Sequence, residues 1–265
     1  MNLRDSWLHQ AAKALVPPAL RPTSVLTRAV VRRTGQAVAS GPFRGMKYVA
    51  SGIGSVYYPK LLGVYERELH PIVEAISRID ADCIIDIGAA EGYYAVGLAL
   101  HNPQTKVVAF EQTPKGQALV REMASQNRVA DRVRILGRCE PGDLNAELAH
   151  AKRAVVVCDV EGYETTLLDL MAVPALAAAW VLVELHEFII AGVGELIRGR
   201  FAGTHRITEI EQTERTRADY PFLPWYTRLL PAAYATYPVN EFRPARMSWL
   251  WLEPRASKGT ADGNR

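Results

Sequence analysis

The sequence predicts a doubly wound α/β fold with a mainly parallel sheet. Two observations carry this prediction. Short, dense apolar runs recur between residues 83 and 185, and a segment of helix length separates each run from the next. Continuous runs rich in Val and Ile are typical of strands that are buried on both faces, as in a parallel sheet. Strands that alternate with helices are joined by crossover connections, which place helices on both faces of one sheet.

Five runs are predicted as strands and the segments between them as helices. The strands are Cys83–Ile87, Lys106–Phe110, Val133–Leu136, Ala154–Cys158 and Trp180–Leu185. The helices are Tyr93–His101, Lys115–Gln126, Leu144–Ala151 and Tyr163–Leu170. Ahead of them, apolar residues recur at helical spacing from Leu62 to Ile79, and Pro71 should kink or divide that helix.

The pattern changes after residue 186. His205–Glu214 and Arg246–Glu253 are predicted as two further strands. Between them, Arg215–Pro244 is an insertion that holds seven of the 22 aromatic residues and five prolines. We therefore expect three parts: a basic N-terminal extension over 1–57, the α/β domain over 58–255 with its aromatic insertion at 215–244, and a solvated tail over 256–265.

The formal charge of +3 hides an asymmetry along the chain. Residues 1–47 hold eight basic side chains and one acid, whereas the rest holds 23 basic and 27 acidic side chains. An acidic body argues against broad nucleic-acid binding, which needs a dense basic face. The basic segment is expected to form short helices at Trp7–Val16 and Val25–Val38. These helices favour a role as a helical cap on the fold. The alternatives are that the segment docks to a membrane or a partner, or that it is an organelle signal.

The rest of the composition indicates a globular protein, with 49% apolar and 22% charged residues. Three cysteines lie far apart with no CxxC pair, which argues against a disulfide framework or a structural zinc site. The longest uncharged apolar stretch, Leu170–Val183, contains Pro174 and is too short to span a bilayer. We expect a cytoplasmic protein, and the sequence leaves its oligomeric state open.

A glycine-rich turn follows the first strand and is the clearest local motif. The run is Asp86-Ile-Gly88-Ala-Ala90-Glu91-Gly92-Tyr93. A buried strand that turns through glycines into a helix offers free N–H groups and close backbone approach to a nucleotide. About twenty residues later the second strand ends in Glu111, whose carboxylate can accept hydrogen bonds from both hydroxyls of a ribose.

The details of this turn favour S-adenosylmethionine over a dinucleotide. The dinucleotide fingerprint requires G-x-G-x-x-G, but here Ala90 stands at the middle glycine and the acid Glu91 follows it. A carboxylate would repel a pyrophosphate, whereas S-adenosylmethionine carries a sulfonium and an ammonium and no phosphate. Asp86 and Glu91 therefore suit a cationic cofactor.

A second group of polar residues follows the fourth and fifth strands. Asp159, Glu161 and Glu164 come after one strand, and Glu184 and His186, with Glu187 beside them, end the other. Carboxyl ends of adjacent parallel strands are where open α/β sheets bind ligands. Such residues could serve as a general base for a hydroxyl or as ligands of a divalent metal. Of these two roles, metal binding is not the favoured prediction. Glu164 and Glu187 are expected to be solvated charges on helix faces.

The pairing of D-I-G-A-A-E-G-Y-Y with D-V-E-G-Y-E and V-E-L-H resembles the FkbM family of S-adenosylmethionine-dependent methyltransferases, over about residues 80–190. Those are class I, Rossmann-like enzymes that methylate hydroxyl oxygens of polyketides, sugars and similar small molecules, and their seventh strand is typically antiparallel, as Trp249–Leu252 would be. The resemblance implies that Gly88, Ala90 and Gly92 line the cofactor and that Glu111 holds its ribose. It implies that Cys139–Glu140 lies near the adenine, and Asp159 and Glu161 near the methyl group.

The expected activity is therefore methyl transfer to a hydroxyl of a small-molecule acceptor. The cofactor site would comprise Asp86, Gly88, Ala90, Glu91, Gly92, Tyr93, Glu111, Cys139, Glu140 and Asp159. The catalytic residues would be Asp159, Glu161 and His186, with the insertion 215–244 as acceptor pocket, lid or simple packing. Three alternatives stay open: a metal-dependent O-methyltransferase that uses Asp159, Glu161 and Glu184, a nicotinamide-dependent oxidoreductase, and a scaffold protein whose working surface is the basic segment.

Overall fold

A computed structural model of the chain describes residue 17 and residues 21–50, 57–222 and 231–255. The chain divides into two compact units. One consists of Met1–Arg67 with Thr213–Phe242, and the other of Glu68–Gln212 with Arg243–Arg265. The insertion up to Phe242 thus belongs to the same unit as the N-terminal segment, although about 150 residues separate them in the sequence.

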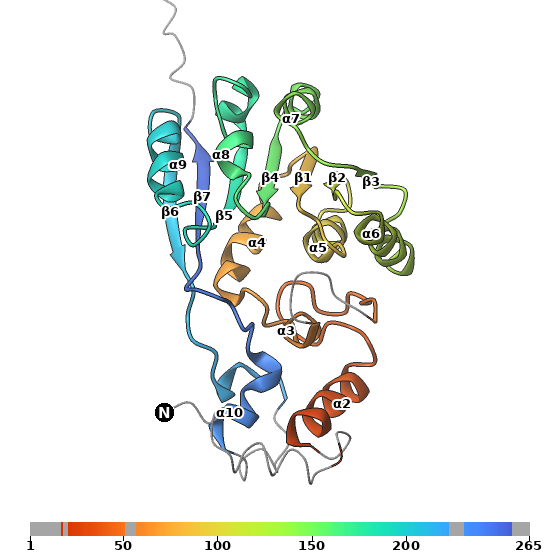
Figure 1. Ribbon diagram of the computed structural model, residues 1–265. Coiled ribbons are helices and arrows are strands. Elements are labelled where there is room, and N and C mark those ends of the chain that lie inside the picture. The colour runs from red at the N-terminus through yellow and green to blue at the C-terminus, as the bar shows by residue number, and fades with distance from the viewer. Residues whose placement is uncertain (1–16, 18–20, 51–56, 223–230, 256–265) are drawn as a thin grey trace, which may run out of the picture. The chain divides into compact units, whose positions relative to one another are not determined.

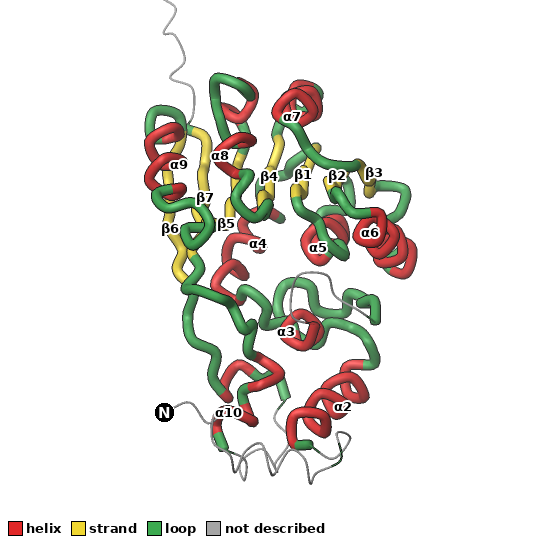
Figure 2. Tube along the Cα trace, in the orientation of Figure 1, coloured by secondary structure: helices red, strands yellow, loops and turns green. Residues whose placement is uncertain are grey.

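A seven-stranded sheet forms the centre of the second unit (Figures 1 and 2). Its order is β3-β2-β1-β4-β5-β7-β6. The strands are β1 (Cys83–Ile87), β2 (Lys106–Phe110), β3 (Val133–Leu136), β4 (Ala154–Cys158), β5 (Trp180–Leu185), β6 (His205–Glu211) and β7 (Ser248–Pro254). Strands β1 to β5 are parallel, and β7 runs antiparallel between β5 and β6. The predicted Rossmann-like fold with an antiparallel last strand is confirmed.

The pairing register brings the carboxyl ends of the central strands level with one another. Ile87 of β1 lies opposite Phe110 of β2 and Cys158 of β4, and Cys158 lies opposite Val183 of β5. The chain winds outward in one direction through β2 and β3 and in the other through β4 and β5, so the topology switches between β1 and β4. Crevices at such switch points are where open α/β sheets bind ligands.

Helices cover both faces of the sheet because successive strand residues point to opposite sides. On one face, Ile85, Val156, Val183 and their neighbours pack against α7 (Pro141–Ala149), α8 (Glu164–Leu167) and α9 (Val193–Phe201). Helices α5 (Tyr93–His101) and α6 (Pro114–Gln126) pack beside each other and contact β1, β2 and β3 (Figure 1). The alternate residues Ile84, Val107 and Val155 are buried as well.

Several boundaries differ from those expected. The region before β1 is not one helix kinked at Pro71 but three pieces: α3 (Tyr57–Leu62), η3 (Arg67–Leu69) and α4 (His70–Ile76). The division occurs around Gly63, at φ +76°, and Pro71 instead occupies the first turn of α4, where a missing N–H costs nothing. Helix α9 was not anticipated. Strand β6 ends at Glu211 and not at Glu214, and α8 is a single turn.

The other unit has its own small core and polar contacts. Helix α2 (Pro22–Thr34) was expected at Val25–Val38, and it ends at Gly35, whose left-handed backbone closes the helix. Leu26 and Val30 of this helix are buried. From the insertion come the short helices η5 (Arg217–Asp219), α10 (Ala232–Ala235) and η7 (Tyr237–Val239). The expected helix at Trp7–Val16 and the aromatic residues Trp225 and Tyr226 lie outside the described residues.

Buried ion pairs tie this unit together. Arg215 pairs with Glu241, and both side chains are at most 3% exposed. The same Glu241 carboxylate accepts a hydrogen bond from the Glu66 backbone N–H at 3.1 Å. Arg67 pairs with Asp219. A buried charge is costly unless it is paired, so each of these side chains needs its partner. The pairs therefore hold together segments that are distant in sequence.

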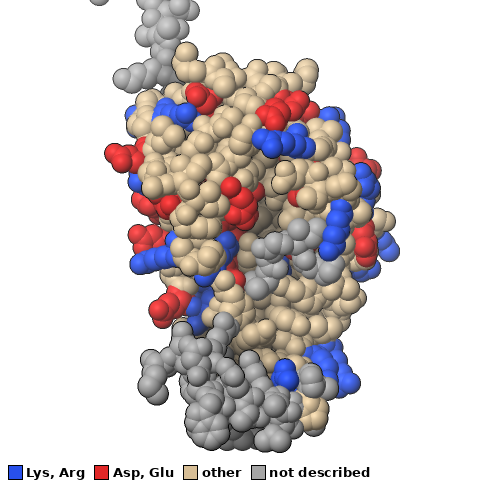
Figure 3. Space-filling model, viewed as in Figure 1, with Lys and Arg blue, Asp and Glu red and all other residues tan. Residues whose placement is uncertain are grey.

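Charged side chains of both signs share the visible face of the described residues. On the face in Figure 3, basic and acidic side chains are interspersed over the described part of the chain. Among those residues, no helix combines the length and the apolar character needed to cross a membrane.

Candidate active site

The turn after β1 is seated directly on the end of β4. Gly88 has φ +88°, and a Cβ at this position would collide with the backbone carbonyl oxygen of Asp159. The Asp159 N–H donates to the Ile87 carbonyl at 2.9 Å, and the Gly88 and Ala89 N–H groups both donate to the Phe110 carbonyl at 3.0 Å. Gly88 is thus required for the close approach of β4, and this close approach sets Asp159 beside the turn.

Ala90 and Gly92 complete the turn with two further left-handed residues, at φ +50° and +94°. Gly92 precedes α5, and a Cβ there would lie 3.4 Å from side-chain carbons of Val96 and Val120. The space left by this glycine is therefore filled by helix packing. Ala90 is a non-glycine residue in a conformation that costs about 1–2 kcal/mol, and its N–H donates to Glu111 at 3.0 Å.

Glu111 lies at the predicted place, immediately after β2, and its carboxylate is held on two sides. One oxygen, Oε2, accepts from Ala90, while Oε1 accepts from the backbone N–H of Thr113 at 2.7 Å and from its hydroxyl at 2.6 Å. Thr113 in turn caps α6 through the Gly116 N–H. Glu111 therefore links the glycine turn to the start of the next helix in a fixed orientation.

Three other residues of the expected cofactor set are buried. Asp86 lies on β1 and is 3% exposed, Glu91 is fully buried, and Tyr93 begins α5 at 5% exposure. The structure thus places the carboxyl groups of Asp86 and Glu91 at the turn, where the sequence put them.

The residues after β3 form a polar clamp with the segment after β4. Glu140 caps α7 in a capping box with Asp143. Its carboxylate also accepts from the Tyr163 hydroxyl at 2.6 Å and from Arg138 Nε at 2.7 Å, while the Arg138 guanidinium lies 4.5 Å from the centre of the Tyr163 ring. The hydrogen bond from Tyr163 and the contact with Arg138 lower the pKa of Glu140. Burial raises the pKa of the neighbouring Cys139 thiol to about 12, so that thiol is unreactive.

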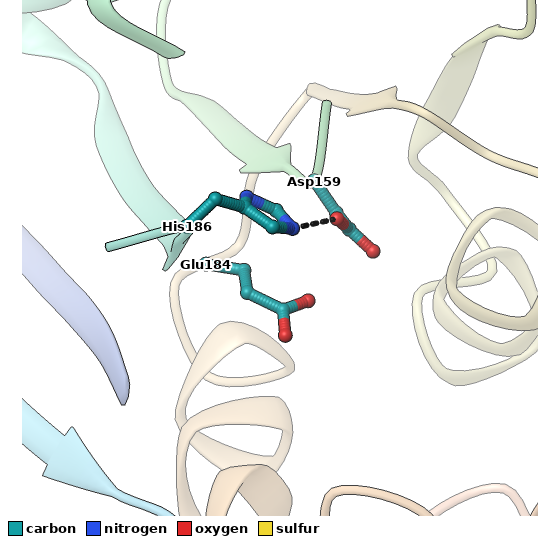
Figure 4. A group of neighbouring side chains, drawn as sticks. All are labelled: Asp159, Glu184 and His186. Carbon is teal, nitrogen blue, oxygen red and sulfur yellow. Dashed lines mark ion pairs between the residues drawn. The ribbon is translucent and has the colours of Figure 1, made fainter. Parts of the chain in front are cut away.

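The ends of β4 and β5 bring together the three residues expected to be catalytic. His186 is almost fully buried, with its side chain 3% exposed, and its Nε2 atom lies 3.5 Å from Asp159 Oδ1 and 3.4 Å from Glu161 Oε2. Asp159 is 41% exposed and Glu161 is 72% exposed. Figure 4 shows the imidazole directed at the Asp159 carboxylate, with Glu184 beneath the ring. Asp159, Glu161 and His186 therefore share one site, as the strand ends predicted.

Glu164 was expected to be a solvated helix-face charge, and that expectation is wrong. Its side chain is fully buried and its Oε1 atom contacts His186 Nδ1 in a short hydrogen bond. The same oxygen accepts from the Gly162 N–H at 3.2 Å. Helix α8 is a single turn that begins at Glu164, and the carboxylate of this first residue points inward to His186. Glu187 is exposed as expected, and it accepts from the N–H groups of Gly192 and Gly194 at the start of α9.

Glu164 sets the protonation of His186. Burial of the ring by itself lowers the pKa of His186, but the hydrogen bond to Glu164 and the charges of Asp159, Glu164 and Glu161 outweigh it and raise the pKa above its usual value. With a carboxylate at Nδ1, that nitrogen carries the hydrogen, and Nε2 faces Asp159 and Glu161.

Arg243 was also missed by sequence reasoning. It pairs with the buried Glu184 and lies 5.7 Å from the centre of the Trp249 ring on β7. The antiparallel strand explains its position, since Trp249 is paired with Glu184 across β5 and β7. No local pattern in the sequence indicates this contact. Glu164, the third acid of D-V-E-G-Y-E, was visible in the sequence, but the direction of its side chain depends on where α8 begins.

Comparison with known proteins gives similarity of structure and none of sequence. No family model matches the chain, and no curated protein sequence matches it. Among solved structures, an S-adenosylmethionine-dependent O-methyltransferase of Thermotoga maritima is similar at 15% identity, with 74% of this chain and 68% of that chain covered and a TM-score of 0.47. A human methyltransferase 10 domain-containing protein gives 13% identity, coverages of 86% and 94%, and a TM-score of 0.48.

A precorrin-6Y C5,15-methyltransferase of Geobacter metallireducens is similar at 11% identity, with coverages of 69% and 87% and a TM-score of 0.46. Identities this low leave the activity to be judged from the residues of the site.

Proposed function

We propose that this protein is an S-adenosylmethionine-dependent methyltransferase that acts on a hydroxyl of a small molecule. One observation carries the proposal. The glycine turn, fixed by Glu111 and seated on Asp159, meets the Asp159–Glu161–His186 group at the topological switch point. A turn that favours a cation and a group that can accept a proton are thus adjacent at one edge of the sheet.

The cofactor would bind over the turn that runs from Gly88 to Tyr93. The sulfonium and the ammonium suit the buried carboxylates Asp86 and Glu91. Glu111 is fixed by Ala90 and Thr113 and would accept hydrogen bonds from the ribose. The Cys139–Glu140 segment, held by Tyr163, would border the adenine.

The reaction would be an in-line displacement. The acceptor oxygen attacks the methyl carbon, the bond from sulfur to carbon breaks with its electron pair left on sulfur, and S-adenosylhomocysteine is the leaving group. The acceptor's proton would pass to Glu161, because this carboxylate is the most exposed of the group and thus the one that an incoming hydroxyl can reach. Asp159 and His186 would orient the acceptor oxygen, and alignment of the two reactants would supply most of the rate.

We also propose, more finely, membership of the FkbM family, a sugar or polyketide-like acceptor, and a cytoplasmic location. The family assignment depends on the D-V-E-G-Y-E and V-E-L-H motifs, whose Glu164 and His186 prove to be in contact. The insertion 215–244 keeps its predicted role as acceptor pocket or lid, which is supported by its aromatic composition alone.

Two alternative functions make different predictions. An oxidoreductase would bind NADH, which the buried Glu91 disfavours; quenching of tryptophan fluorescence by NADH in preference to S-adenosylmethionine would support that alternative. A scaffold protein would bind the cofactor without transferring its methyl group to any acceptor, and would lose its partner when residues 1–40 are deleted.

The proposal is tested by calorimetric titration of S-adenosylmethionine into the full chain. We expect saturable binding, which Glu111→Ala weakens at least tenfold, since about 1.5–3 kcal/mol is lost with a charged hydrogen-bond acceptor. Glu122→Ala serves as the matched control, because Glu122 is an exposed glutamate on the helix that Glu111 adjoins. Circular dichroism checks that each variant folds. An affinity of Glu111→Ala equal to that of the unaltered protein would rule out the cofactor assignment.

The acceptor is sought with labelled S-adenosylmethionine and a metabolite extract, followed by mass spectrometry of labelled products. A labelled product with an O-methyl group is expected, and it should not form with Glu161→Gln. A product labelled on nitrogen or carbon would contradict the proposed class of acceptor.

A further inference from the structure

We propose that Asp159, Glu184 and His186 form a binding site for a divalent transition-metal ion. These residues come from the ends of β4 and β5, and each offers one ligand atom, all within 4.8 Å of one another (Figure 4). The binding of the ion stands independently of the proposed function, whereas its use on an acceptor oxygen rests on that function.

The spacing fits a shared ion. Ligand atoms about 2.0–2.2 Å from one metal lie roughly 3 Å apart at a right angle and at most about 4.4 Å apart on opposite sides. His186 Nε2 and Asp159 Oδ1, at 3.5 Å, already lie in this range. The separations that involve Glu184 are at most 4.8 Å, so the Asp159 and Glu184 side chains must both move toward the imidazole to share one ion.

The second observation concerns the imidazole itself. His186 is 3% exposed, and Glu164 holds its Nδ1 atom, so Nε2 is directed into the group. Nε2 lies 3.4–3.5 Å from carboxylate oxygens of Asp159 and Glu161 and forms none of the hydrogen bonds found among the described residues. Nε2 therefore already pairs with carboxylate oxygens in this arrangement. A divalent ion placed between these atoms would be coordinated by the same nitrogen and oxygens that now form the ion pair.

The arrangement around His186 matches a general feature of metal sites. A histidine that ligates a metal donates its other ring N–H to a carboxylate or carbonyl, which fixes the tautomer and makes the ligand more basic. Glu164 is placed to do this from a fully buried position.

The local charge also favours a cation. Four carboxylates contact or surround the imidazole, namely Asp159, Glu161, Glu164 and Glu184. Arg243 compensates one of them, Glu184, to which it is bonded through Oε1. A carboxylate has two oxygens and can accept from arginine with one while it ligates an ion with the other. Arg243 would then be an outer partner that orients Glu184, as Glu164 orients His186.

One nitrogen and two oxygen ligands define the class of ion. Imidazole ligands suit Zn²⁺, Fe²⁺ and similar ions, whereas Mg²⁺ prefers an all-oxygen octahedron with several waters. Three protein ligands leave positions for an exogenous oxygen. In the proposed reaction this oxygen is the acceptor hydroxyl, and a metal-bound hydroxyl is far more acidic, which would let the weakly basic Glu161 accept its proton.

The test is a Mn²⁺ titration of the full chain after treatment with EDTA and desalting, followed by electron paramagnetic resonance of the free aqueous ion. We expect one saturable site per chain that Zn²⁺ displaces and that Mg²⁺ displaces only at much higher concentration. His186→Ala and Asp159→Asn should each weaken binding at least tenfold. Glu187→Gln tests specificity, because Glu187 is an exposed glutamate beside His186 that bonds the start of α9 and is not a proposed ligand; it should change the affinity by less than threefold.

The outcomes separate the two proposals. Absence of saturable Mn²⁺ binding, or equal affinity in folded His186→Ala, overturns the metal site, whatever the result with S-adenosylmethionine. A loss in Glu187→Gln as large as that in His186→Ala also overturns it, since only a diffuse acidic surface would respond in that way. Saturable Mn²⁺ binding that depends on His186, without any binding of S-adenosylmethionine, supports the metal site and removes the methyltransferase proposal alone.

Discussion

The backbone carbonyl of Asp159 occupies the space that a side chain at Gly88 would need. The contact joins the turn after β1 to the end of β4. It therefore places Asp159, which is proposed to bind the metal and the acceptor, next to the turn that is proposed to bind the cofactor. Gly88 is therefore required so that β4 can pack against the turn. Only through this packing does it affect where a ligand can bind.

Gly88→Ala should destabilise the protein and abolish cofactor binding. The new Cβ would both collide with the Asp159 carbonyl and impose φ +88° on an alanine, and together we expect a cost of at least about 2–3 kcal/mol in the free energy of unfolding. Gly142→Ala is the matched control, because Gly142 is exposed in α7, has nothing within 4 Å, and should gain about 0.5–1 kcal/mol. Urea denaturation measures both. Equal stability of the two variants would contradict the contact.

Ala90→Gly should stabilise the fold slightly. Ala90 sits at φ +50°, a conformation that glycine adopts freely, so the strain of about 1–2 kcal/mol is relieved and part of it is offset by the greater freedom of glycine in the unfolded chain. The expected net gain is up to about 1 kcal/mol. Ala89→Gly, at the buried neighbour without a positive φ, should instead lower stability. A loss of stability in both variants would argue against a strained Ala90.

Glu164→Gln should weaken Mn²⁺ binding roughly 10- to 100-fold, the usual effect of removing an outer carboxylate partner of a metal-ligating histidine. Glutamine keeps the size of the side chain and can still accept from Nδ1, which limits damage to the fold. Glu187→Gln, an exposed change in the same loop as His186, is expected to leave the affinity unchanged. If both variants bind Mn²⁺ equally, Glu164 has no part in the metal site.

His205 should make the protein sensitive to acid. Burial, helped by the charge of Arg255, lowers the pKa of His205 despite its hydrogen bond to the Ala179 carbonyl at 2.9 Å. The folded state therefore binds this proton less readily than the unfolded chain, whose histidine titrates near 6.5. The contribution of neutral His205 to the free energy of unfolding is complete above about pH 6.5. It is lost as the pH falls toward the lower pKa of His205 in the folded state.

Thermal melts from pH 7.5 to pH 5 check this prediction. The melting temperature of the unaltered protein should fall more steeply below pH 6.5 than that of His205→Gln. The exposed His150 provides the control, since His150→Gln should keep the steep fall. A slope that is the same in His205→Gln and in the unaltered protein would show that another group causes the acid sensitivity.

The strands were predictable because each is a local apolar run long enough to be buried on both faces. All five parallel strands begin and end where the apolar runs do. The short helices before β1 were not predictable from the sequence. The apolar spacing from Leu62 to Ile79 is that of one helix, but the left-handed backbone of Gly63 interrupts it. Periodicity reports which residues are buried, and a single backbone conformation can divide an otherwise regular pattern.

The sequence by itself determined the α/β class, the glycine turn, and which strand ends carry acids, since hydrophobic pattern and strand order follow from local residue choice. Only the tertiary structure decided that Glu164 is buried against His186, that Arg243 reaches Glu184 from the end of the insertion, and that Gly88 makes room for Asp159. These contacts depend on the pairing register of β1, β4, β5 and β7. Register is a property of the assembled sheet, and a polar residue at a strand end does not reveal which residue it will meet there.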